Sequence, residues 1–167
     1  MISFQNDILP LKNELFRLAL RITQNRADAE DVVQDTMLKL WNRRDEWEQI
    51  DSIEAFSLTI CRNLALDRVK RMDNQLRSTM LPSDETQDHS YSANPEQQTI
   101  GRDRLTLVNR LIAQLPEKQR TCMQLRDIEG KSYRDIASIL DITEQQVKIN
   151  IFRGRQTVKQ NFFHLDL

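Results

Sequence analysis

Apolar residues recur along this chain at intervals of three and four, the spacing that places side chains on one side of an α-helix. The first such stripe, Leu11, Leu15, Leu18 and Ile22, lies in a helix predicted from Pro10 to Thr23. Only 3 glycines and 4 prolines occur in 167 residues, and no strand-length run alternates apolar and polar positions. The pattern therefore predicts an all-α protein.

Two further helices complete a predicted N-terminal domain, residues 1–75. The first runs from about residue 28 to residue 43 and has a core stripe of Val33, Met37, Leu40 and Trp41. A polar interruption, residues 44–51, separates it from a helix that extends to about Asp73. Ser52 is suited to cap that last helix, because its side chain can accept from a free backbone N–H.

Residues 76–100 are polar, acidic and poor in apolar side chains, so they cannot bury enough surface to fold alone. They are predicted to be a flexible acidic linker to a C-terminal domain, residues 101–167. Net charge along the chain is −2 over residues 1–75, −3 over the linker and +4 over the C-terminal domain. Since nucleic-acid binding needs a local basic surface, the overall charge of −1 does not argue against it.

The C-terminal domain begins with a predicted helix from about Arg102 that ends before Pro116. A second helix has an apolar face of Cys122, Leu125 and Ile128 and ends at Gly130, since glycine readily adopts the left-handed conformation.

Residues 132–140 then form a short amphipathic helix, Asp141 and Ile142 a tight turn, and residues 143–146 a capping box that opens the last helix. This spacing is that of a helix-turn-helix. The buried stripe of the last helix is predicted to be Val147, Ile151, Gly154 and Val158, with Gly154 allowing two helices to approach closely.

Polar, basic and apolar side chains share the opposite side of that last helix, an arrangement suited to DNA bases and phosphates. The candidates for duplex DNA are Gln145, Gln146, Lys148, Ile149, Phe152, Arg153 and Gln156. The plain alternative is a solvated face whose two apolar residues pack against other helices. Arg155 lies nearer the stripe and suits either core or phosphate.

A second candidate surface lies on the helix of residues 28–43. Asp31, Gln34, Asp35 and Leu38 fall together at spacings of three, four and seven. A solvated acidic face explains the charges. An apolar anchor inside a charged ring also describes a protein docking site.

Several segments, in this order, resemble the extracytoplasmic-function (ECF) sigma factors of the sigma-70 family. Residues 28–41 look like the family's polymerase-binding helix and residues 55–67 like its promoter-melting helix, while residues 115–120, 133–140 and 147–155 resemble its C-terminal domain. The resemblance implies a non-enzymatic subunit that directs RNA polymerase to promoters. It implies two helical domains, the second a helix-turn-helix domain.

The resemblance also assigns partners and residues. It implies that Asp31, Gln34, Asp35 and Leu38 dock on the clamp helices of the polymerase's largest subunit, and that the C-terminal domain meets the flap and the minus-thirty-five element. It implies promoter melting and minus-ten binding by Phe56, Arg62, Asn63, Arg68, Lys70 and Arg71. An anti-sigma protein is expected as a further partner, and a free chain with packed domains would be a resting state.

The sequence departs from the family at two places. Phe56 stands where Trp is usual, and Ile149 and Asn150 stand where many members have Ser and Arg. The minus-thirty-five sequence therefore does not follow from the resemblance.

An enzyme, a cofactor and a metal site are not expected. The only histidines, His89 and His164, lie in the linker and the C-terminal tail, and no Gly-rich phosphate loop occurs. Cys61 and Cys122 lack CxxC spacing, which favours buried thiols in the cytoplasm. No signal peptide or membrane span is indicated. A stand-alone helix-turn-helix regulator and a protein-interaction adaptor remain as alternatives.

Overall fold

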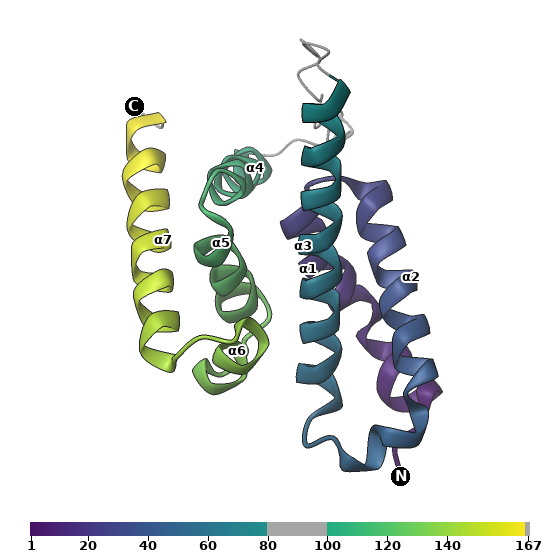
Figure 1. Cartoon of the computed structure of the whole chain (residues 1–167). Helices are drawn as coiled ribbons and strands as arrows, with labels where there is room; N and C mark the ends of the chain where they lie inside the picture. The colour runs from purple at the N-terminus through teal and green to yellow at the C-terminus, as the bar shows by residue number, and fades with distance from the viewer. Residues whose placement is uncertain (80–99, 166–167) are drawn as a thin grey trace.

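A computed structural model gives the structure of the chain and describes residues 1–79 and 100–165. Every regular element within these two ranges is a helix, which confirms the predicted all-α class (Figure 1). Most of the predicted linker, residues 80–99, lies outside the described residues.

Three helices form the N-terminal half: α1 (Lys12–Thr23), α2 (Arg26–Asn42) and α3 (Ile53–Thr79). Each contacts the other two, so they make a three-helix bundle. A π-type helix, Phe4–Ile8, and a 3-10 turn, Leu9–Leu11, precede α1. The α1 stripe is buried as predicted at Leu15, Leu18 and Ile22.

The end of α2 differs from the prediction at one residue. Val33 and Leu40 are buried, but Trp41, which was predicted to be core, is 46% exposed. The 3-10 segment Arg44–Gln49 places Trp47 there instead, 5% exposed, with Nε1 donating to the Leu40 carbonyl at 2.9 Å. The buried Trp47 indole fills this end of the bundle, so Trp41 packs at the edge of the bundle. The ring centroids of Trp41 and Trp47 are 6.3 Å apart.

Helix α3 begins as predicted, since the Ser52 hydroxyl accepts from the backbone N–H of Ala55 at 3.1 Å. It continues past Asp73 to Thr79 and has 27 residues. At 1.5 Å rise per residue it is about 40 Å long.

The C-terminal half contains α4 (Ile100–Ala113), α5 (Glu117–Met123), α6 (Tyr133–Leu140) and α7 (Glu144–Leu165). A π-type segment, Gln124–Ile128, extends α5. Cys122 and Leu125 are buried, but Ile128 is 49% exposed, contrary to the prediction. A π turn has more residues than an α turn, so the apolar face predicted from helical spacing is displaced at Ile128.

The helix-turn-helix has the expected local structure. Asp141 ends α6 in the left-handed conformation at φ 55°. The Thr143 hydroxyl accepts from the Gln146 N–H at 3.1 Å, and the Gln146 side chain accepts from the Thr143 N–H at 2.9 Å, which confirms the capping box. Val147, Ile151 and Gly154 are buried and Val158 is half-buried, as predicted.

Gly154 allows the close approach expected of it. A Cβ added there would lie 2.7 Å from the Sδ atom of Met123 on α5. Helix α7 contacts α5, α6 and α4, and this packing turns its other side away from the domain.

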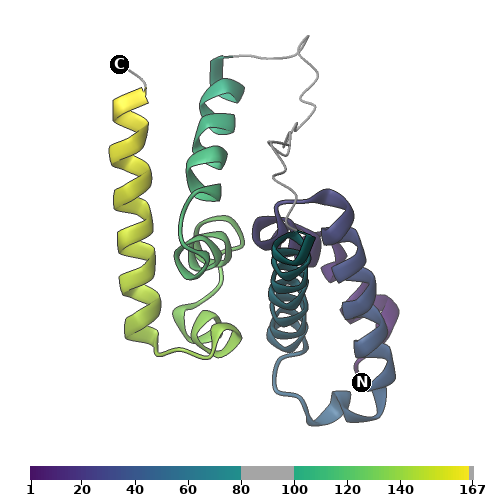
Figure 2. The ribbon, with the colours of Figure 1, turned by 45° about the horizontal axis from the view of Figure 1, so that its top comes forward.

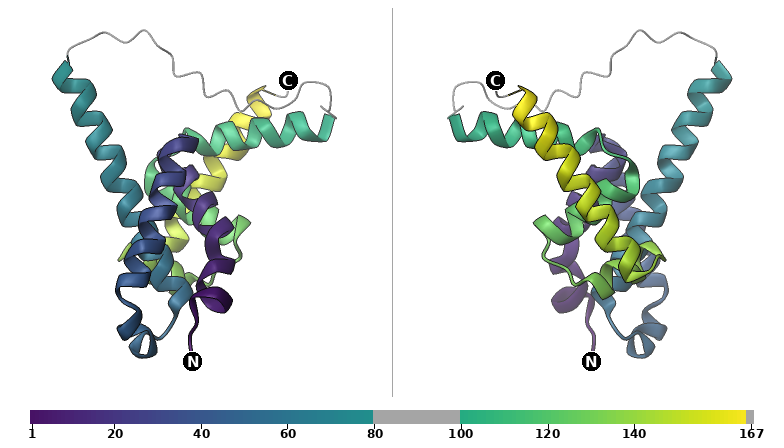
Figure 3. Two further views of the ribbon diagram at one scale, coloured as in Figure 1. Left: turned by 90° about the vertical axis from the view of Figure 1, so that its right-hand side faces the viewer. Right: turned by 90° about the vertical axis from the view of Figure 1, so that its left-hand side faces the viewer.

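The two halves pack against each other. Helix α3 contacts α6, and α1 contacts α5. In Figures 1 and 2, α5 and α6 lie between α7 and α3. Figure 3 shows α3 and α4 diverging from this region.

Candidate functional site

The α2 acidic face comprises Asp31, Gln34, Asp35 and Leu38, and all four side chains are exposed. Leu38 is 58% exposed, although the other side of α2 buries Val32, Val33, Thr36 and Leu40. An exposed leucine between carboxylates combines an apolar anchor with charge. The structure therefore brings together the four residues predicted to bind a partner.

The α2 acidic face is connected to α3 by a single guanidinium. Arg68 Nη2 lies 3.0 Å from Asp28 Oδ1 and 3.1 Å from Asp31 Oδ2. Its side chain is 35% exposed, so solvent screens this pair only in part. One residue of the predicted docking surface and one predicted DNA contact thus share an ion pair.

The six candidate residues on α3 do not share one surface. At about 100° per residue, Phe56, Asn63 and Lys70 fall within a narrow stripe. Arg68 and Arg62 lie on opposite flanks of that stripe, toward α2 and α5 respectively, as their contacts show. Asn63, Lys70 and Arg71 are exposed, and Phe56 is half-buried with the Arg43 guanidinium 5.8 Å from its ring centre.

Arg62 is the candidate whose position was least expected. Its residue is 8% exposed, and its guanidinium donates from Nε and Nη2 to Glu117 of α5 at 3.3 and 3.2 Å. The family resemblance predicts a minus-ten DNA contact for Arg62, whereas in the structure its guanidinium is paired with Glu117. No local pattern indicates a contact between residues 55 positions apart.

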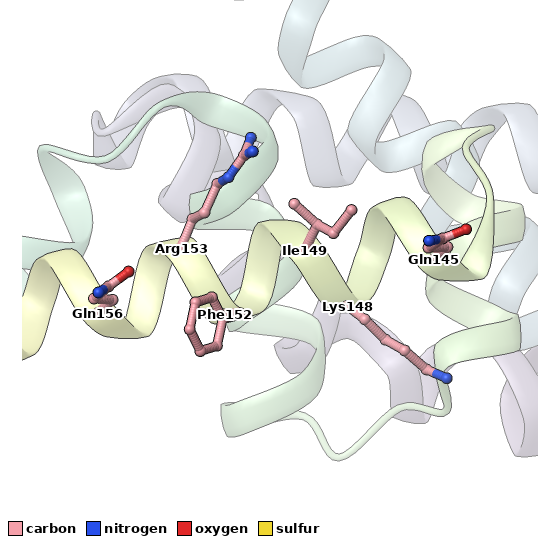
Figure 4. A pocket seen from close by; sticks show the side chains of 6 residues that line it. All are labelled: Gln145, Lys148, Ile149, Phe152, Arg153 and Gln156. Carbon is pink, nitrogen blue, oxygen red and sulfur yellow. The ribbon is translucent and has the colours of Figure 1, made fainter.

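The α7 outer face comprises the seven candidate DNA-binding residues Gln145, Gln146, Lys148, Ile149, Phe152, Arg153 and Gln156. All seven are exposed. Ile149 is 40% and Phe152 66% exposed, so these apolar side chains do not pack into the domain. Figure 4 shows six of the seven along one side of α7, where they border a shallow hollow.

Three polar residues on or beside this face already make intramolecular contacts. The Gln146 side-chain oxygen is used in the capping box. Arg155, left open between core and phosphate, donates from Nε to Asp127 at 3.1 Å, and this hydrogen bond raises its pKa further above the ordinary arginine value. Lys148 lies 5.4 Å from the ring centre of Tyr133 on α6.

Cys61 and Cys122 are buried free thiols. Burial raises the pKa of each to about 12, which favours the neutral, unreactive form. Among the described residues, no cluster of three or more His, Cys, Asp or Glu side chains is arranged to hold a metal ion. In the same part of the chain, no helix is long and apolar enough to cross a membrane.

Comparison with known proteins shows which family the chain is similar to. Residues 8–75 match the family model "Sigma-70 region 2", and residues 105–158 match "Sigma-70, region 4". The chain is 33% identical over 135 residues to the ECF RNA polymerase sigma factor SigL of Mycobacterium tuberculosis, a match that covers 80% of this chain and 74% of the relative. The chain belongs to the ECF family of sigma factors.

Other ECF sigma factors match over different shares of their length. SigE of Mycolicibacterium smegmatis is 32% identical over 151 residues, which are 88% of this chain but only 56% of that relative. SigW of Bacillus subtilis is 24% identical over 155 residues, covering 89% of this chain and 83% of the relative.

Solved sigma factors share the fold over nearly the whole chain. The sigma factor RpoE, in complex with the anti-sigma factor NepR from Bartonella quintana, has a TM-score of 0.76 at 21% identity and 98% coverage of both chains. CnrH, in complex with the cytosolic domain of CnrY, has a TM-score of 0.69 at 19% identity, with 96% of this chain and 88% of that chain covered. The family matches do not favour the stand-alone regulator or the adaptor.

Proposed function

We propose that this ECF sigma factor binds core RNA polymerase through the α2 acidic face and carries it to promoters that α7 and α3 recognise. The observation that carries the proposal is the exposure of both faces. Leu38 and Phe152 are 58% and 66% exposed, whereas the opposite sides of α2 and α7 are buried. Apolar side chains held in water within polar surroundings are suited to partner contacts.

In this proposal residues 1–75 form the polymerase-binding and melting domain, and residues 101–167 the domain for the minus-thirty-five element. Residues 76–100 link them, although residues 76–79 continue α3 and Ile100 begins α4. The α2 acidic face meets the clamp helices of the polymerase's largest subunit, and the C-terminal domain also meets the flap. The protein acts in the cytoplasm, where the polymerase is found, and contributes binding rather than catalysis.

In this proposal α3 and the residues just before it open the promoter. The exposed stripe that contains Asn63 and Lys70 receives the melted minus-ten strand, with Phe56 at its start and Arg62, Arg68 and Arg71 supplying positive charge. An unstacked base captured beside aromatic and polar groups is a common way to hold single-stranded DNA. The loop from Arg44 to Ser52 forms one wall of the pocket that holds this base.

The α7 outer face reads duplex DNA. Gln145 and Arg153 offer donors to base edges, Lys148 offers charge to phosphate, and Phe152 offers an apolar surface to a thymine methyl group. An anti-sigma protein is a further proposed partner, supported by the two structural neighbours that were solved with such proteins.

The deciding experiment is transcription in vitro with core polymerase from the source organism and a library of its upstream regions. The intact chain should produce specific transcripts. A variant with Asp31, Gln34, Asp35 and Leu38 all changed to Ala should produce none, because it lacks the docking face. A matched control with Glu30→Ala and Lys39→Ala, which changes exposed α2 residues outside that face, should retain transcription.

The two alternatives predict different results in the same assay. Tight duplex binding by the chain alone, without transcripts, would indicate a stand-alone regulator. Failure to bind DNA even with polymerase present would indicate an adaptor.

A further inference from the structure

The middle of the α7 outer face is apolar. Ile149 is 40% and Phe152 66% exposed, and three positions separate them, so they are neighbours on one side of the helix. Figure 4 shows them between Gln145 and Gln156 along the shallow hollow. A single exposed apolar residue is ordinary on a protein surface, but an adjacent pair beside a hollow is typical of a contact surface.

Polar side chains next to this pair are already engaged within the protein. Asn150 Nδ2 donates to the Gln146 carbonyl, one turn earlier, at 2.8 Å. The Gln146 side-chain oxygen accepts from the Thr143 N–H at 2.9 Å. Lys148 Nζ lies 5.4 Å from the ring centre of Tyr133. These contacts leave apolar carbon as the main chemistry that the middle of the face offers to a partner.

Basic side chains border the apolar pair on both sides. In Figure 4, Lys148 and Arg153 point to opposite edges of the α7 outer face. Residues 101–167 carry a net charge of +4. Positive edges suit the phosphates on the two sides of a DNA groove. The charge therefore favours duplex DNA over an uncharged apolar partner.

The major groove of DNA presents one apolar group, the C5-methyl of thymine, among the hydrogen-bonding edges of the bases. An apolar pair without free polar groups can recognise that methyl group and gains little from the other bases. Ile149 stands where many ECF sigma factors have Ser, which offers a hydroxyl instead. The apolar pair is therefore a feature of this chain and departs from the common pattern of the family.

We propose that Ile149 and Phe152 recognise thymine methyl groups in the minus-thirty-five element, and that Ile149 determines the preference for thymine there. The inference rests on the proposed function, since it takes α7 as the helix that enters the major groove. It goes further by naming what the middle of the face recognises. Gln145 and Arg153 are left to form hydrogen bonds with neighbouring base pairs.

The first test compares two duplexes that differ only in methyl groups. A fluorescein-labelled duplex rich in dA·dT pairs is compared with the same duplex in which deoxyuridine replaces every thymidine. Binding of the full chain is followed by anisotropy at low salt. We expect the wild type to bind the thymidine duplex about 3-fold to 5-fold more tightly, the effect of burying one methyl group.

Substitutions on α7 should change this preference in a graded way. Ile149→Ser should reduce it to less than about 2-fold, because the apolar side chain that contacts the methyl group is removed. Adding Phe152→Ser should abolish it. Ile149→Leu, which keeps an apolar side chain of the same size, should retain it. A preference that survives Ile149→Ser with Phe152→Ser would overturn the inference.

Ile128→Ser is the matched control. Ile128 is 49% exposed, comparable with Ile149, but it lies on the segment Gln124–Ile128 and does not border the hollow. Its substitution should leave the preference for thymidine unchanged. Uracil also alters the DNA itself, but that effect is the same for every variant and cancels in the comparison. Equal losses for Ile128→Ser and Ile149→Ser would overturn the role of the α7 outer face.

The second test uses the holoenzyme on a promoter that the transcription experiment has found. Each thymidine of the minus-thirty-five element is replaced in turn by deoxyuridine. At one or more positions the affinity should fall about 3-fold to 5-fold with the wild type, and less than about 2-fold with Ile149→Ser. An element in which no thymidine is sensitive would overturn the inference.

These outcomes are distinguishable from failure of the proposed function. Specific transcription without any methyl preference would overturn the recognition of thymine and leave the proposed function standing. A methyl preference that depends on Ile149, without transcription, would support the inference and overturn the role with polymerase. If Ile149→Ser does not fold, Ile149→Ala, which has the strongest helix propensity, takes its place in both tests.

Discussion

Arg68 on α3 and Asp31 on α2 form an ion pair, with 3.1 Å between Nη2 and Oδ2. The same guanidinium contacts Asp28. This ion pair therefore joins one residue of the proposed polymerase-binding surface to one residue of the proposed strand-binding surface. A partner that binds either residue must compete with the ion pair. Occupation of Asp31 by a basic group of the polymerase leaves Arg68 with one carboxylate partner instead of two.

Arg68→Gln should change two affinities in opposite directions. Core polymerase binding should tighten by up to about 5-fold, because Asp31 no longer has an intramolecular counter-ion and a partly exposed pair contributes roughly 0.2–1 kcal/mol. Binding of single-stranded DNA should weaken by a similar factor. Anisotropy titrations with labelled polymerase and labelled DNA measure both, with Lys39→Gln, an exposed basic residue of α2 outside both proposed surfaces, as the control for charge alone. If both affinities fall together, Arg68 acts through stability and not through competition.

Gly154→Ala should destabilise the protein by up to about 2 kcal/mol. The added methyl group would meet Met123 Sδ at 2.7 Å, and overpacking a core outweighs the gain in helix propensity of about 1 kcal/mol. Urea unfolding measures the change. In a Met123→Ala background the same substitution should be neutral or stabilising, because the cavity accepts the methyl group. An equal loss in both backgrounds would show that the Met123 contact is not responsible.

Thr143→Ala should lower the free energy of unfolding by about 1 kcal/mol, since it removes the side-chain acceptor for the Gln146 N–H at the start of α7. Thr143→Ser, which keeps the hydroxyl, should retain most of that stability. Gln145→Ala changes a neighbouring exposed residue outside the capping box and should stay within about 0.5 kcal/mol of the wild type. Thermal melts distinguish the three. A loss for Gln145→Ala as large as that for Thr143→Ala would contradict the assignment.

The buried thiols predict a loss of stability at alkaline pH. Burial raises the pKa of Cys61 and Cys122 from 9.0 to about 12, so the folded chain keeps protons that the unfolded chain releases. Their contribution is fully present below pH 9 and is lost as pH rises from 9 to 12, by up to about 1.4 kcal/mol per pH unit for each thiol. Urea unfolding at several pH values should be measured for the wild type and for the double variant with Cys61→Ala and Cys122→Ala. The difference between the two proteins gives the contribution of the thiols, because the double variant lacks both. Parallel pH curves for the two proteins would contradict the prediction.

Features that depend on neighbouring residues could be predicted from the sequence. The buried stripe of α7 and the Thr143–Gln146 capping box follow from spacings within one helix, and both are present. The position of Trp47 could not be predicted, because it depends on how the segment Arg44–Gln49 turns back onto α2. The Arg62–Glu117 contact was equally out of reach, since a basic residue on a helix has the same local pattern whether it faces solvent, DNA or another domain.

The packing of the two halves against each other also has a consequence for synthesis of the chain. Arg17 and Glu129, which meet across the interface, are 112 residues apart. At about 5–20 residues per second, roughly 5–20 seconds pass between their addition. During that interval the apolar sides of α1 and α3 have no C-terminal half to cover them. The N-terminal bundle is therefore made with this apolar surface still open to water.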